Sequence, residues 1–293
     1  MSHLLKNKHL ELVWDFPLEK YRFSRFDWTG KISSLKYEGM ELLAKETLES
    51  LDYNSIGKGL YNEFGISEPI GFEEIPVGGW FHKIGVGLLQ KETTPYFFAH
   101  DYKIKPAKFQ FTANSHKIAI LCNSASINGY AYSLSKEIAL MEKGVIIRYR
   151  LINTGKKTIK TDEYTHNFMG IGGNFTSEDY VLKFPFELDP DIFSETVNPD
   201  QNVVIQKDKI ILDKSLKAQF FFGNLSGGKE RKASWELHNV RANIGIRETG
   251  DFKTTKINLW GWKHVISPEL FFKVSIKPSE SMQWVRKYDV FSL

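Results

Sequence analysis

Hydrophobic and polar residues alternate along much of this chain. At 103–105, 117–121 and 144–151 every second side chain is apolar, which is the period of a β-strand with one buried face. Turn signals separate these runs. One of them, Asn128-Gly129, tolerates the positive φ angles that a two-residue hairpin turn requires. The pattern therefore predicts a β-hairpin over 117–138.

Strand-like runs recur along the whole chain at spacings of about ten residues, which favours an all-β sandwich or barrel. No domain boundary and no internal repeat is visible, so we expect residues 1–293 to form a single domain. Two segments depart from the alternating pattern. The segment 38–51 fits either a helix or a strand, and the glycine-rich segment 57–87 is expected to form a long ordered loop.

Composition excludes several classes of partner. The chain has 293 residues, of which 42% are hydrophobic, and a mean hydropathy of -0.32, as in soluble globular proteins. Its 39 basic and 35 acidic residues are scattered along the sequence, so no nucleic-acid partner is expected. Cys122 is the only cysteine, which excludes an intrachain disulfide and a cysteine-based metal site.

The sequence also bears on location. Charged residues interrupt the beginning of the chain before an apolar run develops, so no signal peptide is predicted. No stretch approaches the roughly 18 consecutive apolar residues of a membrane-spanning helix, so no membrane partner is expected. We expect a cytoplasmic protein, and the sequence leaves open whether it is a monomer or a homodimer.

Candidate chemistry begins with one histidine. His166 lies in a strand-like run in which Tyr164, His166 and Phe168 share one face. The imidazole is therefore expected among aromatic rings, where burial would lower its pKa. The alternative is a core histidine that is hydrogen-bonded to a backbone carbonyl and has no chemical role.

A glutamate in an apolar run is the second candidate. Glu269 lies within the largely apolar segment 265–274, and burying a carboxylate there is costly unless it is paired or used. Pro268 removes a ladder hydrogen bond just before it, which predicts an edge strand or a bulge. The alternative is an outward-facing residue at a strand start. Together, His166 and Glu269 can form a general acid/base pair, and the many aromatic residues nearby suggest chemistry on a sugar.

Further residues are expected at the rim of the same pocket, where aromatic rings would stack on the apolar face of a sugar and polar groups would orient it. This expected substrate-binding set is His100, Asn62, Trp80, Lys83, His82 and Trp262. No two histidines have the HxH or HxxxH spacing of a strong metal site. We therefore expect neither a metal nor a cofactor.

Taken in order, several short motifs resemble the galactose mutarotase-like superfamily, which includes aldose 1-epimerases and hexose-phosphate mutarotases. The resemblance covers nearly the whole chain. It rests on the opening segment 25–35, on Leu151-Ile152-Asn153-Thr154-Gly155 followed by the His166 strand, and on Ser267-Pro268-Glu269 followed by 276–281. Ser279 stands where the superfamily pattern prefers glycine.

The resemblance implies a large antiparallel β-sandwich whose concave face holds a small-molecule sugar or sugar derivative. It further implies that Glu269 is the base that takes the proton of the anomeric hydroxyl, and that His166 is the acid that protonates the ring oxygen. The sugar ring would then open, and reclosure would give the other anomer.

The chain departs from this resemblance at one place. Many members carry a His-Gly-x-x-Arg pattern in the loop before the middle strands, whereas residues 82–90 read HKIGVGLLQ. This departure favours an alternative function, that of a carbohydrate-binding protein of the same fold that has no catalytic activity. A polysaccharide lyase is the least favoured reading, because the chain lacks room for the helical domain that such enzymes usually need.

Overall fold

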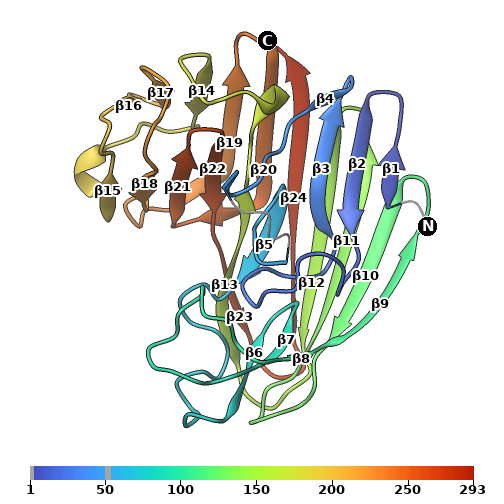
Figure 1. Cartoon of the computed structure of the whole chain (residues 1–293). Coiled ribbons are helices and arrows are strands. Elements are labelled where there is room, and N and C mark those ends of the chain that lie inside the picture. The colour runs from blue at the N-terminus through green and yellow to red at the C-terminus, as the bar shows by residue number, and fades with distance from the viewer. Residues whose placement is uncertain (1–2, 50–53) are drawn as a thin grey trace.

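The computed structural model describes residues 3–49 and 54–293, and antiparallel β-sheets dominate this part of the chain. Its helical segments are the 3-10 turns η1 (Ile171–Gly173) and η2 (Pro190–Ile192). Two large sheets form the main layers, with smaller sheets and long loops at their ends (Figure 1). The prediction of an all-β sandwich is therefore confirmed.

The larger layer is a ten-stranded sheet. Its strands follow the spatial order β16 (Val203–Gln206), β17 (Lys209–Leu212), β14 (Tyr180–Lys183), β19 (Arg231–Asn239), β20 (Ile244–Thr254), β24 (Ser281–Ser292), β12 (Gly144–Asn153), β11 (Tyr132–Met141), β10 (Lys117–Asn123) and β9 (Lys108–Ala113). The burial of β10 alternates along the strand, so one face of this sheet meets the core and the other meets solvent.

The facing layer is a seven-stranded sheet. Its strands follow the order β1 (Leu4–Lys6), β2 (Leu10–Asp15), β3 (Lys31–Tyr37), β5 (Leu60–Phe64), β13 (Ile159–Asn167) and β23 (Phe272–Ile276), and β4 (Met40–Glu41) pairs with β3. Leu12 and Ile32 from this sheet share one apolar core with Ile118 and Ile147 from the ten-stranded sheet. Burial of these aliphatic side chains holds the two layers together.

Two smaller sheets complete the fold. One has the order β15 (Glu195–Val197), β18 (Phe220–Gly223), β21 (Ile257–Trp262) and β22 (Val265–Leu270), and the other has the order β6 (Trp80–Lys83), β7 (Gly87–Gln90) and β8 (Ile104–Pro106). Pro268 lies in β22, which is the edge strand of its sheet. The edge position predicted for this proline is therefore confirmed, because a residue without an N–H is tolerated where no further strand must be bonded.

The hairpin expected over 117–138 is present. β10 and β11 pair in antiparallel register from Lys117–Ala139 to Asn123–Ser133. At the tip, Asn128 and Gly129 adopt φ angles of 54° and 84°, which is the left-handed region that the sequence signal requires.

The structure differs from the expectation for the segment 57–87 and resolves the ambiguity of most of the segment 38–51. The segment 57–87 is not one long loop, because it contains β5 and β6. All five residues of β5 are buried, so the strand lacks the alternation by which half-buried strands are recognised. In the ambiguous segment 38–51, the described residues form β4 and extended chain rather than a helix, and residues 50–51 lie outside the described part.

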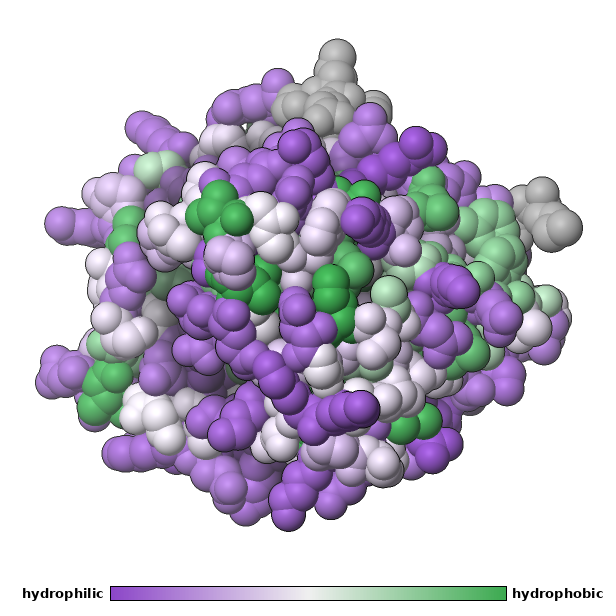
Figure 2. All heavy atoms as spheres, turned by 90° about the horizontal axis from the view of Figure 1, so that it is seen from below, coloured by the Kyte–Doolittle hydropathy of each residue, from purple (hydrophilic) through white to green (hydrophobic). Residues whose placement is uncertain are grey.

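The loops around β6 and β7 lie at one end of the molecule (Figure 1). That end is mainly hydrophilic, and its hydrophobic residues lie in small separate groups (Figure 2). Across residues 3–49 and 54–293, no helix has the length and apolar character needed to cross a membrane.

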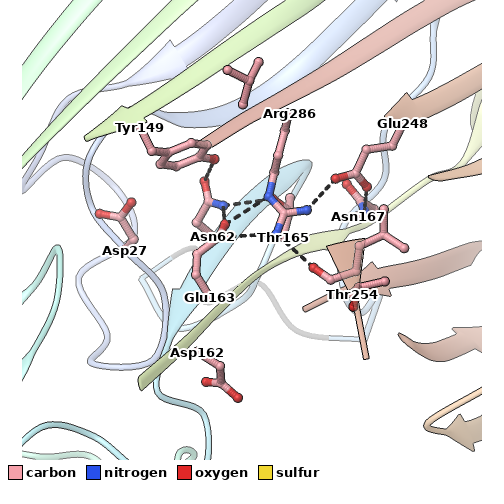
Figure 3. Close-up of polar contacts among 12 residues, drawn as sticks. Asp27, Asn62, Tyr149, Asp162, Glu163, Thr165, Asn167, Glu248, Thr254 and Arg286 are labelled. Carbon is pink, nitrogen blue, oxygen red and sulfur yellow. Dashed lines mark hydrogen bonds and ion pairs between the residues drawn. The ribbon is translucent and has the colours of Figure 1, made fainter. Parts of the chain in front are cut away.

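A buried ion cluster lies between the two large sheets (Figure 3). Arg286 of β24 is fully buried and donates to both carboxylate oxygens of Glu163, at 3.1 and 2.6 Å, and to Glu248 at 2.6 Å. Asn167 donates to Glu248 at 2.9 Å. Glu163, Thr165 and Asn167 share one face of β13, so this cluster anchors that face of the strand and leaves the opposite face free for other contacts.

Candidate active site

His166 and Glu269 meet at the junction of two sheets. His166 is the penultimate residue of β13, and Glu269 is the penultimate residue of β22. The imidazole Nε2 lies 3.3 Å from the Glu269 Oε1, although the two residues are about a hundred positions apart in the sequence. The convergence expected from the sequence is therefore present in the structure, and both side chains are nearly fully buried.

Backbone contacts hold the two strands at this spacing. Met169 and Ile266 exchange two backbone hydrogen bonds, at 3.0 and 2.9 Å. The Asn167 side chain donates to the Pro268 carbonyl at 2.6 Å. Because Asn167 follows His166 and Pro268 precedes Glu269, these bonds fix the distance between the catalytic candidates through their immediate neighbours.

Aromatic rings enclose the imidazole, as the alternation of β13 predicts. The ring of Phe168 stacks on His166 with centroids 4.0 Å apart and planes at 12°. The indole of Trp260 meets the imidazole edge-on at 5.4 Å. Burial among these rings, and to a smaller extent the charge of Arg25, lowers the pKa of His166 well below its ordinary 6.5. The imidazole is therefore neutral at neutral pH.

The Glu269 carboxyl shifts in the opposite direction. Burial raises its pKa to about 8, and Arg25 only partly opposes the shift. Ser267 joins the pair from behind, since its Oγ lies 2.6 Å from the His166 Nδ1 and 3.5 Å from the Glu269 Oε1. A protonated Glu269 can donate to Nε2 while Nδ1–H donates to Ser267, which satisfies both imidazole nitrogens.

The pair opens onto a cavity of about 630 Å³, here called the site cavity. Aromatic side chains form much of its wall, and carboxylates and amides supply most of its polar groups. The lining residues are Arg25, Glu46, Thr47, Glu49, Ile66, Phe98, Tyr164, His166, Gln219, Phe221, Asn258, Trp260, Trp262 and Glu269. A wall that combines aromatic rings with converging polar groups is typical of small-molecule sites.

A second buried glutamate lies behind the cavity wall. Glu63 of β5 accepts hydrogen bonds from Arg25 at 3.0 Å, from Lys83 at 3.0 Å and from the Tyr164 hydroxyl at 2.7 Å. Burial by itself would raise the pKa of Glu63, but Lys83 and Arg25 outweigh it, so the pKa is lowered. Arg25 also donates to Glu46 at 3.0 Å, which leaves this cavity-lining cation paired with two carboxylates.

Of the residues expected to bind substrate, Trp262 lines the site cavity and the other five do not. The Asn62 amide points into the inter-sheet cluster, where it donates to Glu163 at 2.6 Å. The reason is register: Asn62 pairs with Thr165, and Thr165 lies on the face of β13 opposite His166.

The remaining four residues are engaged elsewhere. The ammonium of Lys83 is buried against Glu63, and the His82 ring packs beside Tyr130 and Tyr132. His100 lies 3.1 Å from Glu92. Trp80 packs beneath Lys105, whose ammonium is 3.9 Å from the centre of a ring of the indole.

Sequence reasoning missed several cavity residues. Trp260 lies two positions before Trp262 on β21, so the period of a strand places both on one face. Tyr164 likewise shares the His166 face, and Asn258 pairs with Glu269 across β21 and β22. Strand alternation was therefore a usable signal for Trp260 and Tyr164. No local pattern identified Arg25, whose partners are distant in the sequence.

The described residues offer no cluster of three or more histidine, cysteine, aspartate or glutamate side chains arranged to hold a metal ion.

Comparison with known proteins places the fold. No protein-family model and no curated protein matches the sequence. Among solved structures, a candidate aldose 1-epimerase from Escherichia coli K12 matches with a TM-score of 0.63 and 10% identity, covering 100% of this chain and 99% of the other.

Galactose mutarotase-like proteins match in the same way. The protein from Lactobacillus casei has a TM-score of 0.60 and 12% identity, with 98% and 99% of the two chains covered. The protein from Clostridium acetobutylicum has a TM-score of 0.61 and 12% identity, with 99% and 95% covered. This chain therefore has the galactose mutarotase-like sandwich fold, and the resemblance expected from the sequence motifs is confirmed at that level.

Proposed function

We propose that this protein interconverts the anomers of a sugar, with His166 and Glu269 as its acid/base pair. The observation that carries the proposal is the 3.3 Å contact between the two groups on the wall of an aromatic-lined cavity. The similarity of the fold to aldose 1-epimerase-like and galactose mutarotase-like structures supports it. Because that similarity extends to the fold alone, the chemical argument rests on the site itself.

The pair carries the right number of protons. With the pKa of Glu269 raised to about 8 and that of His166 lowered below 6.5, the two groups share one titratable proton at neutral pH. These pKa values favour the proton on Glu269. Its transfer to Nε2 gives a carboxylate that can accept a proton beside an imidazolium that can donate one, and the two groups then titrate as a unit.

In the proposed reaction Glu269 removes the proton of the anomeric hydroxyl while His166 protonates the ring oxygen. The bond between the anomeric carbon and the ring oxygen breaks, and a carbonyl forms at the anomeric carbon. Rotation about the adjacent carbon–carbon bond presents the other face of the carbonyl. Reclosure reverses both proton transfers and restores the pair. Each positioned proton transfer contributes a factor of about 10²–10⁴ in rate.

The single proton shared by His166 and Glu269 determines how the rate of anomer exchange should depend on pH. The pair needs one proton, so activity should fall as the pH rises through about 8, where Glu269 loses its proton. The acidic limb should lie well below pH 6.5, because the second proton must enter a site that disfavours imidazolium. A profile of rate against pH, with an alkaline limb absent from the uncatalysed reaction, checks the assignment.

The direct test is anomer exchange, followed by polarimetry or NMR with freshly dissolved α-anomers of glucose, galactose and other aldoses. His166→Ala and Glu269→Gln should each lower the catalysed rate by a factor of about 10²–10⁴. Glu187→Gln, at a glutamate whose side chain is 73% exposed, is the matched control and should retain the wild-type rate. Absence of acceleration by the wild-type protein for every aldose would contradict the proposal.

One observation favours a second function, that of a sugar-binding protein without catalytic activity. Lys83, His82 and His100 lie away from the described lining of the site cavity, and its cation Arg25 is paired with Glu63 and Glu46. No further cation would then assist ring opening. This alternative predicts saturable sugar binding that survives Glu269→Gln and no effect of the protein on anomer exchange.

A further inference from the structure

One face of the four-stranded sheet extends outward from the catalytic candidates. Residues paired on neighbouring antiparallel strands point to the same face. The pairs Ser267–Trp260, Trp260–Phe221 and Phe221–Val197 therefore form one row across β22, β21, β18 and β15, strands that lie side by side in Figure 1. With neighbouring strands about 4.8 Å apart, the row spans about 14 Å.

From Trp260 to Val197 this row is apolar and faces outward, while Ser267 at its inner end is buried behind His166. Trp260 and Phe221 are half-buried and line the site cavity, and Val197 is 41% exposed at the outer end. The neighbouring residues Phe220 and Phe222 point the other way and are buried in the core. The core is therefore filled by the side chains of the inner face and does not need those of the outer row. An exposed row of apolar side chains that leads away from a cavity is typical of a ligand-binding surface.

The polar groups beside the row are amides and carboxylates, and the carboxylates Glu46 and Glu49 are paired with Arg25 and Lys263. Gln219 and Asn258 line the cavity, and the Gln219 Oε1 accepts from the Trp260 indole at 3.3 Å. Arg25 is already paired with Glu46. Amides that can bond hydroxyl groups, next to aromatic rings that can cover apolar ring faces, fit an uncharged saccharide.

We propose that the substrate is the reducing end of a linear, uncharged oligosaccharide, an inference that rests on the proposed function. The terminal ring lies at His166 and Glu269, and the following rings cross the strands over Trp260 and Phe221 toward Val197. A free monosaccharide would cover only the inner end of the row. The length of the track and its open outer end at the edge strand β15 favour a chain of several rings.

The test compares sugars of increasing length. Anomer exchange at the reducing end is measured by NMR for glucose and galactose, for cellobiose, lactose and maltose, and for cellotriose and maltotriose. In at least one series kcat/KM should rise by about tenfold or more from monosaccharide to trisaccharide, since each further ring buries apolar surface. Binding of the same sugars by calorimetry gives a readout that does not depend on turnover.

Matched variants locate the effect. Val197→Asp should reduce the advantage of the trisaccharide over the monosaccharide by about tenfold, because a charge at the outer end disrupts apolar contact with the added rings. Phe221→Ala should reduce it at least as much. Val240→Asp is the control, because Val240 is 56% exposed in the turn between β19 and β20, away from the row, and it should preserve the chain-length preference.

The outcomes separate the two proposals. Acceleration of monosaccharides with no gain in rate or binding for longer sugars would overturn the oligosaccharide inference and leave the proposed function standing. Binding that tightens with chain length, without acceleration of any sugar, would overturn the proposed function and support the row as a saccharide track. Neither acceleration nor binding for any of these sugars would overturn both.

Discussion

Two buried glutamates near the site cavity, Glu63 and Glu269, have pKa values that are shifted in opposite directions. Glu63 receives hydrogen bonds from Arg25, Lys83 and Tyr164, and its pKa is lowered despite complete burial. Glu269 is equally removed from water but contacts a neutral histidine, and burial raises its pKa to about 8.

The difference lies in the partners rather than in the burial. Desolvation disfavours the charged form of both carboxyls, and only Glu63 has cations close enough to reverse the effect. A paired carboxylate in this position is a fixed structural charge, whereas an unpaired one can exchange a proton near neutral pH. The protein thus places a stable anion behind the wall of the site cavity and a titratable group on that wall.

Removing the paired carboxylate should give the largest effect on stability. Glu63→Gln leaves Arg25 and Lys83 buried without their shared counter-charge, and losing one partner of a buried ion pair costs about 3–5 kcal/mol. Urea unfolding of the variant should show this loss. Glu187→Gln serves as the exposed control. A loss below about 1 kcal/mol would mean that the two cations are compensated without Glu63.

The unpaired carboxyl should make stability depend on pH. Between its ordinary pKa of 4.5 and the folded value of about 8, the folded chain holds one more proton than the unfolded chain, so stability falls as pH rises. The lowered pKa of His166 acts in the opposite direction only below 6.5. From pH 6.5 to 8 the His166 effect is therefore absent, and the contribution of Glu269 amounts to about 2 kcal/mol.

Glu269→Gln isolates this contribution. From pH 6.5 to 8 the free energy of unfolding of the variant, measured by urea at several pH values, should fall by about 2 kcal/mol less than that of the wild type. Identical slopes in the two proteins would show that Glu269 is ionised throughout this range, and the contrast with Glu63 would disappear.

A smaller effect is expected behind the pair, at Ser267. This residue is fully buried and does not line the cavity, so it acts as a positioning residue rather than a nucleophile. Ser267→Ala leaves the His166 Nδ1–H without its acceptor, which costs about 1–3 kcal/mol and should lower the rate about tenfold or more. Ser267→Thr, which keeps the hydroxyl, should recover part of the rate. A merely structural role would leave the alkaline limb of the pH profile unmoved, whereas a shifted limb supports coupling to the pair.

The smallest effect is expected at Asn258, the cavity residue that pairs with Glu269 across β21 and β22. Asn258 is hydrogen-bonded to Glu269 and slightly lowers its pKa. A hydrogen bond contributes about 1 kcal/mol and one pKa unit corresponds to about 1.4 kcal/mol, so Asn258→Leu should move the alkaline limb upward by about 0.7 unit. An acidic shift would show that another group controls that limb.

Strand periodicity accounts for the parts of the site that could be predicted. The alternation around His166 placed the imidazole among aromatic rings, and the apolar run around Glu269 marked its carboxyl as unusual. Trp262, which was also expected at the pocket, lines the site cavity. Asn62 was misplaced because neighbouring strands share faces, and the face of β5 is decided by its pairing with β13, which no local pattern reveals.

The sequence could not predict the contacts of residues whose partners lie far away along the chain. Arg25 meets Glu63 and Tyr164, which are 38 and 139 positions away in the sequence, and Lys83 was expected in the pocket because nothing local marks its burial against Glu63. The row from Trp260 to Val197 likewise exists only after three strands have paired.

The alternating runs of the sequence were enough to predict the strands with one buried face and the side chains that share that face, because the period of two is a local property of extended backbone. The fully buried strand β5 lacks this signal and was not predicted. The sequence also determined that one histidine and one glutamate lie in apolar surroundings. Which buried carboxyl is paired with cations, and which titrates near neutral pH, follows from the folded arrangement of the strands. That choice depends on distances of a few ångströms between residues far apart in the chain, because electrostatic interactions in a desolvated interior are set by those distances.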